Sequence, residues 1–203
     1  MKKYAVLHEP GDIVTLAGTR FVVLDVERRG SLPDSLFLLA LESVGASEFG
    51  SSNNYAESDL KKAVDKWLED MGKRGLDNAK LIPREIDLTT LDGSGCYGKL
   101  SVKAAPLTLD EAREYADIIP NAERWCWLAT GWSGPSKSDG DLALYVYSNG
   151  DWNFNFCSHS FGIRPALKAP SILFEDSEAG LDLSKIPTDD LLQEIHRRLA
   201  EKA

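Results

Sequence analysis

The chain has 203 residues, 43% of them hydrophobic and 27% charged, a balance typical of a globular protein with an ordinary core. Its formal net charge is −9, and basic pairs such as Arg28-Arg29 form no stripe, so we expect no nucleic-acid partner. No stretch approaches the roughly 18 apolar residues that cross a bilayer, and the apolar stretch near the N-terminus is too short for a secretion signal. We therefore expect a cytoplasmic protein without a membrane partner.

The metal-binding residue types are scattered. The cysteines and histidines are Cys96, Cys126, Cys157, His8, His159 and His196. An odd number of cysteines without close spacing predicts neither a disulfide framework nor a zinc site. We expect no metal and no cofactor, and folding that is independent of metal.

Three β-strands are predicted in the first fifty residues. Apolar residues over 12–16 and 21–26, with Gly18 in the turn between them, are typical of a β-hairpin. Turn-forming residues place a loop at 28–34. The run at 35–41 is short and almost wholly apolar, so we expect a strand that is buried on both faces.

Two helices follow these strands. Apolar residues recur with helical spacing over 60–71, where Ser58 is a suitable N-cap and Gly72 a stop signal. The capping box Thr-Leu-Asp-Glu at 108–111 predicts the start of a second helix, which we expect to end at Pro120.

The remaining core is predicted to be loops and strands. Residues 73–105 have little periodicity and predict loops with short strands. Ser-Asn-Gly-Asp at 148–151 is a hairpin signal. Further strands are expected at 125–128, 142–147, 152–156 and 163–167.

The composition changes after residue 170. We divide the chain into a domain at 1–170, an acidic linker at 171–183 and a helix at 184–203, with Thr188 placed to cap it. The apolar stripe of this helix is narrow, and an isolated helix of this length is marginal in water. The helix is expected either to contact a second copy or another protein, or to fold back onto its own sheet.

Six segments of the chain form an ordered pattern. They are GDIV at 11–14 with FVVLD at 21–25, NYAESDL at 54–60 with WL at 67–68, residues 107–115, Trp127-Leu128, ALYV at 143–146 and GIRPAL at 162–167. Over residues 10–170 the pattern resembles a domain family of unknown function that is common in phages, prophages and gut bacteria. That family is similar to the C-type-lectin-like fold of sulfatase-modifying enzymes and of the variable proteins of diversity-generating retroelements. The resemblance implies an α+β fold: a twisted, mainly antiparallel sheet with two flanking helices, here with a C-terminal helical appendage.

The chain departs from the catalytic and metal-binding members of that fold. Calcium-dependent lectins use Trp-Asn-Asp and Glu-Pro-Asn motifs, whereas this chain has Trp152-Asn153-Phe154 and no Glu-Pro-Asn. Sulfatase-modifying enzymes depend on a close pair of cysteines, and Cys126 and Cys157 do not match that motif. Cys157 and His159 lack an orienting third residue. We expect no catalytic residue, and the cysteines are interpreted as small buried side chains.

Binding-type residues gather in the loop at 130–139 and the hairpin at 149–160. Aromatic side chains that alternate with amides and hydroxyls give adaptable contact area, and the resemblance places the variable residues of retroelement proteins in the same region. The alternative is that the aromatic side of the strand belongs to the core. The expected ligand-binding residues are Trp132, Ser133, Ser136, Lys137, Trp152, Asn153, Asn155, Ser158 and His159.

These features predict a non-catalytic module that recognises a protein or a small-molecule ligand, and the resemblance implies that a phage or prophage encodes it. It would lie in the host cytoplasm or in a virion. One alternative is a divergent sulfatase-modifying-type enzyme that uses Cys126 or Cys157. Another is a structural virion component that assembles through its C-terminal helix. Arg164 is expected to be structural, with carboxylate or carbonyl partners, and Trp127 to lie in the core while Trp132 lies on the surface.

Overall fold

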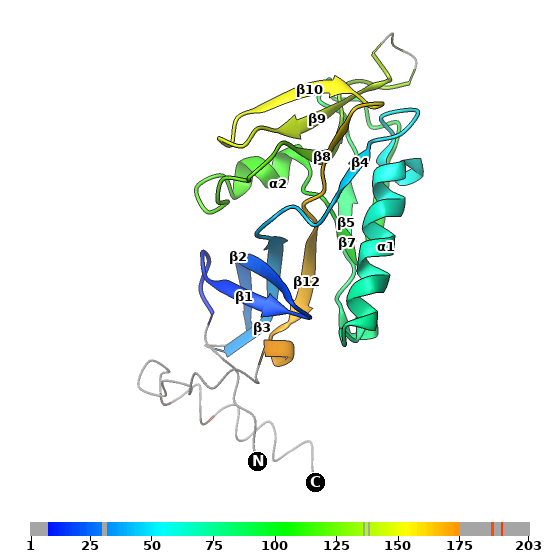
Figure 1. Ribbon diagram of the computed structural model, residues 1–203. Helices are drawn as coiled ribbons and strands as arrows, with labels where there is room; N and C mark the ends of the chain where they lie inside the picture. Colours follow the sequence, from blue (N-terminus) through cyan, green and yellow to red (C-terminus); the bar gives the residue numbers. More distant parts are fainter. Residues whose placement is uncertain are drawn as a thin grey trace.

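The computed structural model describes residues 8–29, 32–135, 137, 139–174, 188 and 192. Over these residues the fold is α+β, with two five-stranded sheets, a two-stranded hairpin and two α-helices (Figure 1). The first sheet has the strand order β1 (Ile13–Leu16), β2 (Thr19–Arg29), β3 (Leu32–Ala40), β12 (Ala166–Pro170) and β7 (Ala104–Ala105). All neighbours in it are antiparallel.

The second sheet carries the predicted binding hairpin. Its strand order is β10 (Trp152–Phe156), β9 (Leu142–Val146), β8 (Cys126–Gly131), β11 (Ser160–Gly162) and β4 (Ala46–Glu48). Only the β11–β8 pair within it is parallel. The separate hairpin joins β5 (Arg84–Asp87) to β6 (Lys99–Val102). The mainly antiparallel character is confirmed, whereas the expectation of one sheet is wrong.

The first strands follow their sequence signals closely. Ala17 and Gly18 both have positive φ, of 46° and 75°, as a two-residue hairpin turn of the right twist requires. Residues 35–40 of β3 are buried on both faces, as predicted, with Phe37 partly exposed. The loop expected at 28–34 is shorter in the structure, because β2 extends to Arg29 and β3 begins at Leu32.

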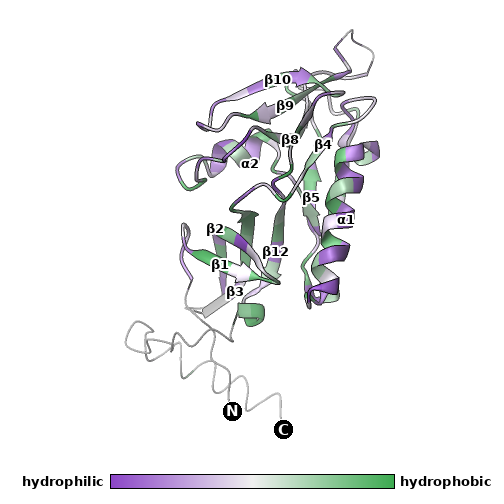
Figure 2. Cartoon of the chain, in the orientation of Figure 1, coloured by the Kyte–Doolittle hydropathy of each residue, from purple (hydrophilic) through white to green (hydrophobic). Residues whose placement is uncertain are grey.

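The long helix, α1 (Asp59–Lys73), begins where the sequence predicts. The side chain of Ser58 accepts a hydrogen bond from the backbone N–H of Lys61, which satisfies a free donor of the first turn. The helix buries one face, formed by Leu60, Val64, Trp67 and Met71. Figure 2 shows it as alternating hydrophobic and hydrophilic bands, as burial of one side requires.

The second helix, α2 (Leu109–Glu114), has the predicted capping box between Thr108 and Glu111. It ends well before Pro120, however, and turns occupy residues 115–118. A proline excludes a helix beyond it but does not require the helix to reach it. Three short 3₁₀ helices complete the described elements: η1 (Tyr55–Glu57), η2 (Asn78–Lys80) and η3 (Ser171–Phe174).

Two of the crossings, the segments that lead from one five-stranded sheet to the other, lie side by side. One leads from β3 to β4 and the other from β11 to β12 (Figure 1). Backbone hydrogen bonds from Ala40 N–H to the Pro165 carbonyl and from Val44 N–H to the Ile163 carbonyl, both 2.8 Å, hold the crossings together. The main core packs α1 against both sheets, and a second core cluster includes Leu109 from α2.

The C-terminal predictions are tested only at their start. Residues 171–174 of the expected linker form η3, whose Phe174 is buried. The rest of the linker lies outside the described residues, and so does the predicted helix apart from Thr188 and Leu192.

Candidate functional site

Three aromatic side chains lie on one face of β10, the edge strand of the second sheet. Trp152, Phe154 and Phe156 are 45%, 40% and 52% exposed, and we call them the aromatic strip. They pair with Val146, Leu144 and Leu142 of β9, so the three point to the same side. The side chains of this strip are thus about half exposed, although Leu144 of β9 on the same face is fully buried in the second core cluster.

The amide side of β10 is the less exposed side. Asn153 and Asn155 are half-buried, and the Asn153 amide donates to the Tyr147 hydroxyl over 3.0 Å. The Asn153 and Asn155 side-chain oxygens also accept the backbone N–H groups of Phe154 and Phe156, at 2.9 and 2.8 Å. Unpaired N–H groups on an edge strand attract a further strand, and satisfying them with side chains blunts that edge.

Trp132 supports the middle of the strip. Its ring centroid lies 4.0 Å from that of Phe154, and the side chain is half-buried rather than on the surface as expected. At one end of the strip, the Arg113 guanidinium carbon lies 5.2 Å from the Trp152 ring centroid. At the other end, the exposed His159 ring approaches Phe156 edge-on, with centroids 6.2 Å apart.

Of the remaining predicted site residues, some are exposed and one is buried. Ser158 and Lys137 are exposed, and the Lys137 ammonium pairs with Asp92, which helps to lower the pKa of that carboxyl to about 2. Ser133 is 2% exposed, so its side chain does not face the surface as expected. Ser136 lies outside the described residues.

The expected loop at 130–139 is also shorter than predicted. Thr130 and Gly131 belong to β8 and are buried. The buried side chain of Asn53 holds the loop that follows in place. Its amide donates hydrogen bonds to the Ser133 and Leu142 carbonyls, both at 2.9 Å. Asn53 in turn accepts a hydrogen bond from the Tyr97 hydroxyl. Sequence reasoning missed this buried residue because it lies in a polar Gly/Ser/Asn-rich stretch.

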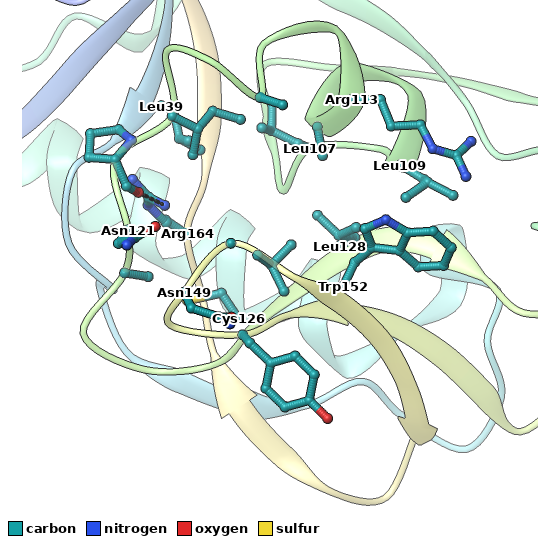
Figure 3. Close-up of a pocket in the computed structure, with 18 of the residues that line it drawn as sticks. Leu39, Leu107, Leu109, Arg113, Asn121, Cys126, Leu128, Asn149, Trp152 and Arg164 are labelled. Atoms are coloured by element: carbon teal, nitrogen blue, oxygen red, sulfur yellow. Dashed lines mark hydrogen bonds between the residues drawn. The ribbon is translucent and has the colours of Figure 1, made fainter.

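A cavity of about 330 Å³ adjoins the aromatic strip at Trp152 (Figure 3). It lies between α2, the loop that follows α2, and strands β8 and β9. Its walls are mainly apolar and include Leu39, Leu107, Leu109, Leu128 and Val146. This volume is at the lower end of the ~300–1,000 Å³ range of small-molecule sites. Sequence analysis did not predict the cavity, because its walls come from segments far apart in the chain.

The two buried thiols lie in or just after the strands that flank β9, near opposite ends of it. Cys126 pairs with Val146, whereas Cys157 follows Phe156, which pairs with Leu142. Four residues of strand correspond to about 13 Å. Burial raises the pKa of Cys126 to about 11 and that of Cys157 to about 12, so both are overwhelmingly thiols near neutral pH. This geometry opposes chemistry in which both thiols act together.

Native alkylation should therefore be confined to Cys96, the exposed cysteine. At pH 8 we expect iodoacetamide to label this residue in the folded chain, and to label Cys126 and Cys157 only after denaturation. The raised pKa values also make the free energy of unfolding depend on pH. Unfolded thiols ionise near pH ~8.5 whereas the buried ones do not, so the folded state loses stability as the pH rises above about 8.5. Mass spectrometry of the labelled peptides measures the extent of alkylation at each cysteine. Rapid labelling of Cys126 in the folded chain would contradict its burial.

Among the described residues, no three His, Cys, Asp or Glu side chains come together as a metal site. Within the same ranges no helix is both long and apolar enough to cross a membrane. No protein-family model, curated protein or solved structure matches this chain.

Proposed function

We propose that this chain is a non-catalytic recognition module that binds a protein or a small-molecule ligand through the aromatic strip and the adjoining cavity. The observation that carries the proposal is the exposure of three large aromatic side chains on one face of an edge strand. Exposed aromatic clusters are costly to hydrate and mark interaction sites, where aromatic side chains supply much of the contact energy.

The mode of binding follows from the edge chemistry of β10. The asparagine side chains already occupy the backbone N–H groups of Phe154 and Phe156, which disfavours addition of a partner strand. A partner would instead lie across the face of the strip. Trp132 beneath Phe154 makes that face rigid, and a rigid contact surface loses little entropy on binding.

A C-type-lectin-like architecture, and an origin in phages or prophages, are part of the same proposal. Two observations support the architecture: the sheets are mostly antiparallel and two helices accompany them. The segments that resemble the family fall, in order, on the β1–β2 hairpin, α1, α2, β8, β9 and the crossing to β12. The β9–β10 hairpin of this chain would then be the recognition element.

The test is a selection of peptide ligands from a random displayed library, followed by affinity measurement with purified variants. The triple variant Trp152→Ala/Phe154→Ala/Phe156→Ala should weaken binding of the selected peptides at least tenfold. Because each side chain is already substantially exposed, each change alone should alter the free energy of unfolding by no more than about 1 kcal/mol. Calorimetry and urea unfolding measure the two effects.

Trp125→Ala is the matched control. Trp125 is 42% exposed, similar to the strip, but it packs on Tyr145, whose side chain lies on the amide side of β10. The control should retain the affinity of the unmodified chain. Equal affinity of the triple variant, or an equal loss in the control, would contradict recognition through the strip.

A further inference from the structure

The charge of the cavity is opposite to that of the chain. The whole sequence has 32 acidic and 23 basic residues, yet the described residues that line the cavity include Arg113 and Arg164 and no Asp or Glu. Figure 3 places Arg164 beside Asn121 at one end and Arg113 near Leu109 and Trp152 at the other. Arg113 is already paired with Asp110 at 3.5 Å, so the buried Arg164 is the cation that favours an anion in this apolar cavity.

Arg164 has unused hydrogen-bonding capacity at its end of the cavity. The side chain is 7% exposed, its Nε donates to the Ala40 carbonyl over 2.8 Å, and Nη1 donates to the Pro120 carbonyl over 3.0 Å. Its Nη2 is buried and has no hydrogen-bond partner among the described residues. Both acceptors are neutral carbonyls, and among the described residues no carboxylate hydrogen-bonds to this buried cation, although the charge of Glu42 acts on it from nearby. Buried guanidinium groups are normally satisfied and paired with carboxylates.

The space between the two arginines is suited to an apolar group. Leu107, Leu109, Leu128 and Val146 line it, and Trp152 lies at the end where the cavity meets the strip. A ligand that filled this space would bury its hydrocarbon body at about 25 cal/mol for each Å² removed from water. Specificity would come from the few polar groups at the ends.

We infer that the cavity binds a carboxylate attached to an apolar or aromatic body, with the carboxylate seated beside Arg164 and the body directed toward Trp152. This inference rests on the proposed function, because it assigns a ligand class to the same site. A free organic acid and the C-terminal carboxylate of a peptide share this chemistry. The anion would place a negative charge directly against a guanidinium whose hydrogen bonds among the described residues go only to neutral carbonyls.

The test compares ligands that differ only in charge, with the full chain unaltered. The first pair is 4-phenylbutyrate and 4-phenylbutyramide, and the second is the peptide Gly-Gly-Leu-Phe with a free or an amidated C-terminus. In calorimetry at pH 7.5, the acid of at least one pair should bind at least tenfold more tightly than its amide. Preference in the first pair alone identifies a small acid, and preference in the second alone identifies a peptide C-terminus.

Protein variants locate the binding. Ala112→Phe, which adds a ring to a cavity wall, should abolish binding of the preferred acid, whereas Ala63→Phe on α1, a half-buried helical alanine outside the cavity, should leave it unchanged. Arg113→Gln should weaken the acid by about two- to threefold, because Arg113 is half-exposed and solvent screens it. Arg164→Lys, provided that it stays folded, should remove most of the acid preference.

Three outcomes would overturn the inference: equal affinity for acid and amide in both pairs, no acid binding at 10 mM, or full affinity in Ala112→Phe. None of them bears on the aromatic strip. Recognition through the strip is tested separately by the triple variant and its selected peptides, so the two failures are distinguishable.

Discussion

Replacing Trp127 by alanine is expected to lower the free energy of unfolding by about 3–5 kcal/mol, the range for deleting a large buried aromatic side chain. Trp127 is 1% exposed and packs against Phe49 and Phe161, with ring centroids 5.5 and 4.6 Å away. Its indole N–H also donates to the Ser47 carbonyl over 2.9 Å. Alanine would leave a cavity and an unpaired carbonyl inside the main core.

Urea unfolding monitored by circular dichroism measures this loss. Trp127→Phe retains most of the volume and removes the hydrogen bond, so it should cost less than alanine and separate packing from the polar contact. Trp125→Ala is the surface control and should cost no more than about 1 kcal/mol. A loss at Trp127 no larger than the ~1 kcal/mol expected at Trp125 would show that Trp127 does not hold the core together.

Arg164→Met is expected to cost about 2–4 kcal/mol, because it removes a buried charged hydrogen-bonding group. The prediction that Arg164 is buried and bonded to carbonyls is confirmed. Its guanidinium links the end of β3, at Ala40, to Pro120 in the loop after α2, and it does so from the crossing between the sheets. Methionine would leave two carbonyls without a donor while preserving much of the side-chain volume.

The measurement is again the urea midpoint, with Arg164→Lys as the matched variant. Lysine keeps the charge but loses the planar fork that reaches two carbonyls at once, so its stability should lie between those of the unmodified chain and Arg164→Met. Burial lowers the pKa of Arg164, but arginine stays protonated throughout the accessible range, so the loss should not depend on pH. An unchanged midpoint in Arg164→Met would contradict a structural role.

Local signals explain the parts of the fold that the sequence predicted well. The Ser58 cap, the helical spacing in α1 and the Thr108–Glu111 capping box all depend on residues within one or two turns of each other. Strand alternation at 152–156 and the turn at 148–151 are equally local. Such patterns carry enough information to locate an element, because the physical cause acts over a few residues.

Long-range pairing could not be predicted in the same way. Short strands such as β4, β7 and β11 have no pattern of their own and exist because distant strands pair with them. The division into two sheets depends on where the chain crosses between layers, which no periodicity reports. Alternation in β10 likewise predicted two different sides but not which of them is exposed, because that depends on what covers each face.

The candidate site was partly predictable for the same reason. Trp152, Asn153 and Asn155 share one strand, so their grouping was visible in the sequence. The cavity draws on α2, the loop after it, two strands and Arg164, and only the tertiary fold brings these together. Arg164 was expected to be buried, but its position at the end of a cavity follows from the crossing that carries it.

The claim that recognition occurs through the strip and the cavity is tested most directly by the indole N–H resonances of the five tryptophans. Selected peptides, or the preferred carboxylate, are titrated into ¹⁵N-labelled protein. Trp152 and its neighbour Trp132 should shift with saturation, while Trp67 in the core and Trp125 on the amide side, neither of which lines the cavity, should not. Saturable shifts at Trp125 or Trp67, with Trp152 and Trp132 unmoved, would place the binding surface elsewhere and contradict the account.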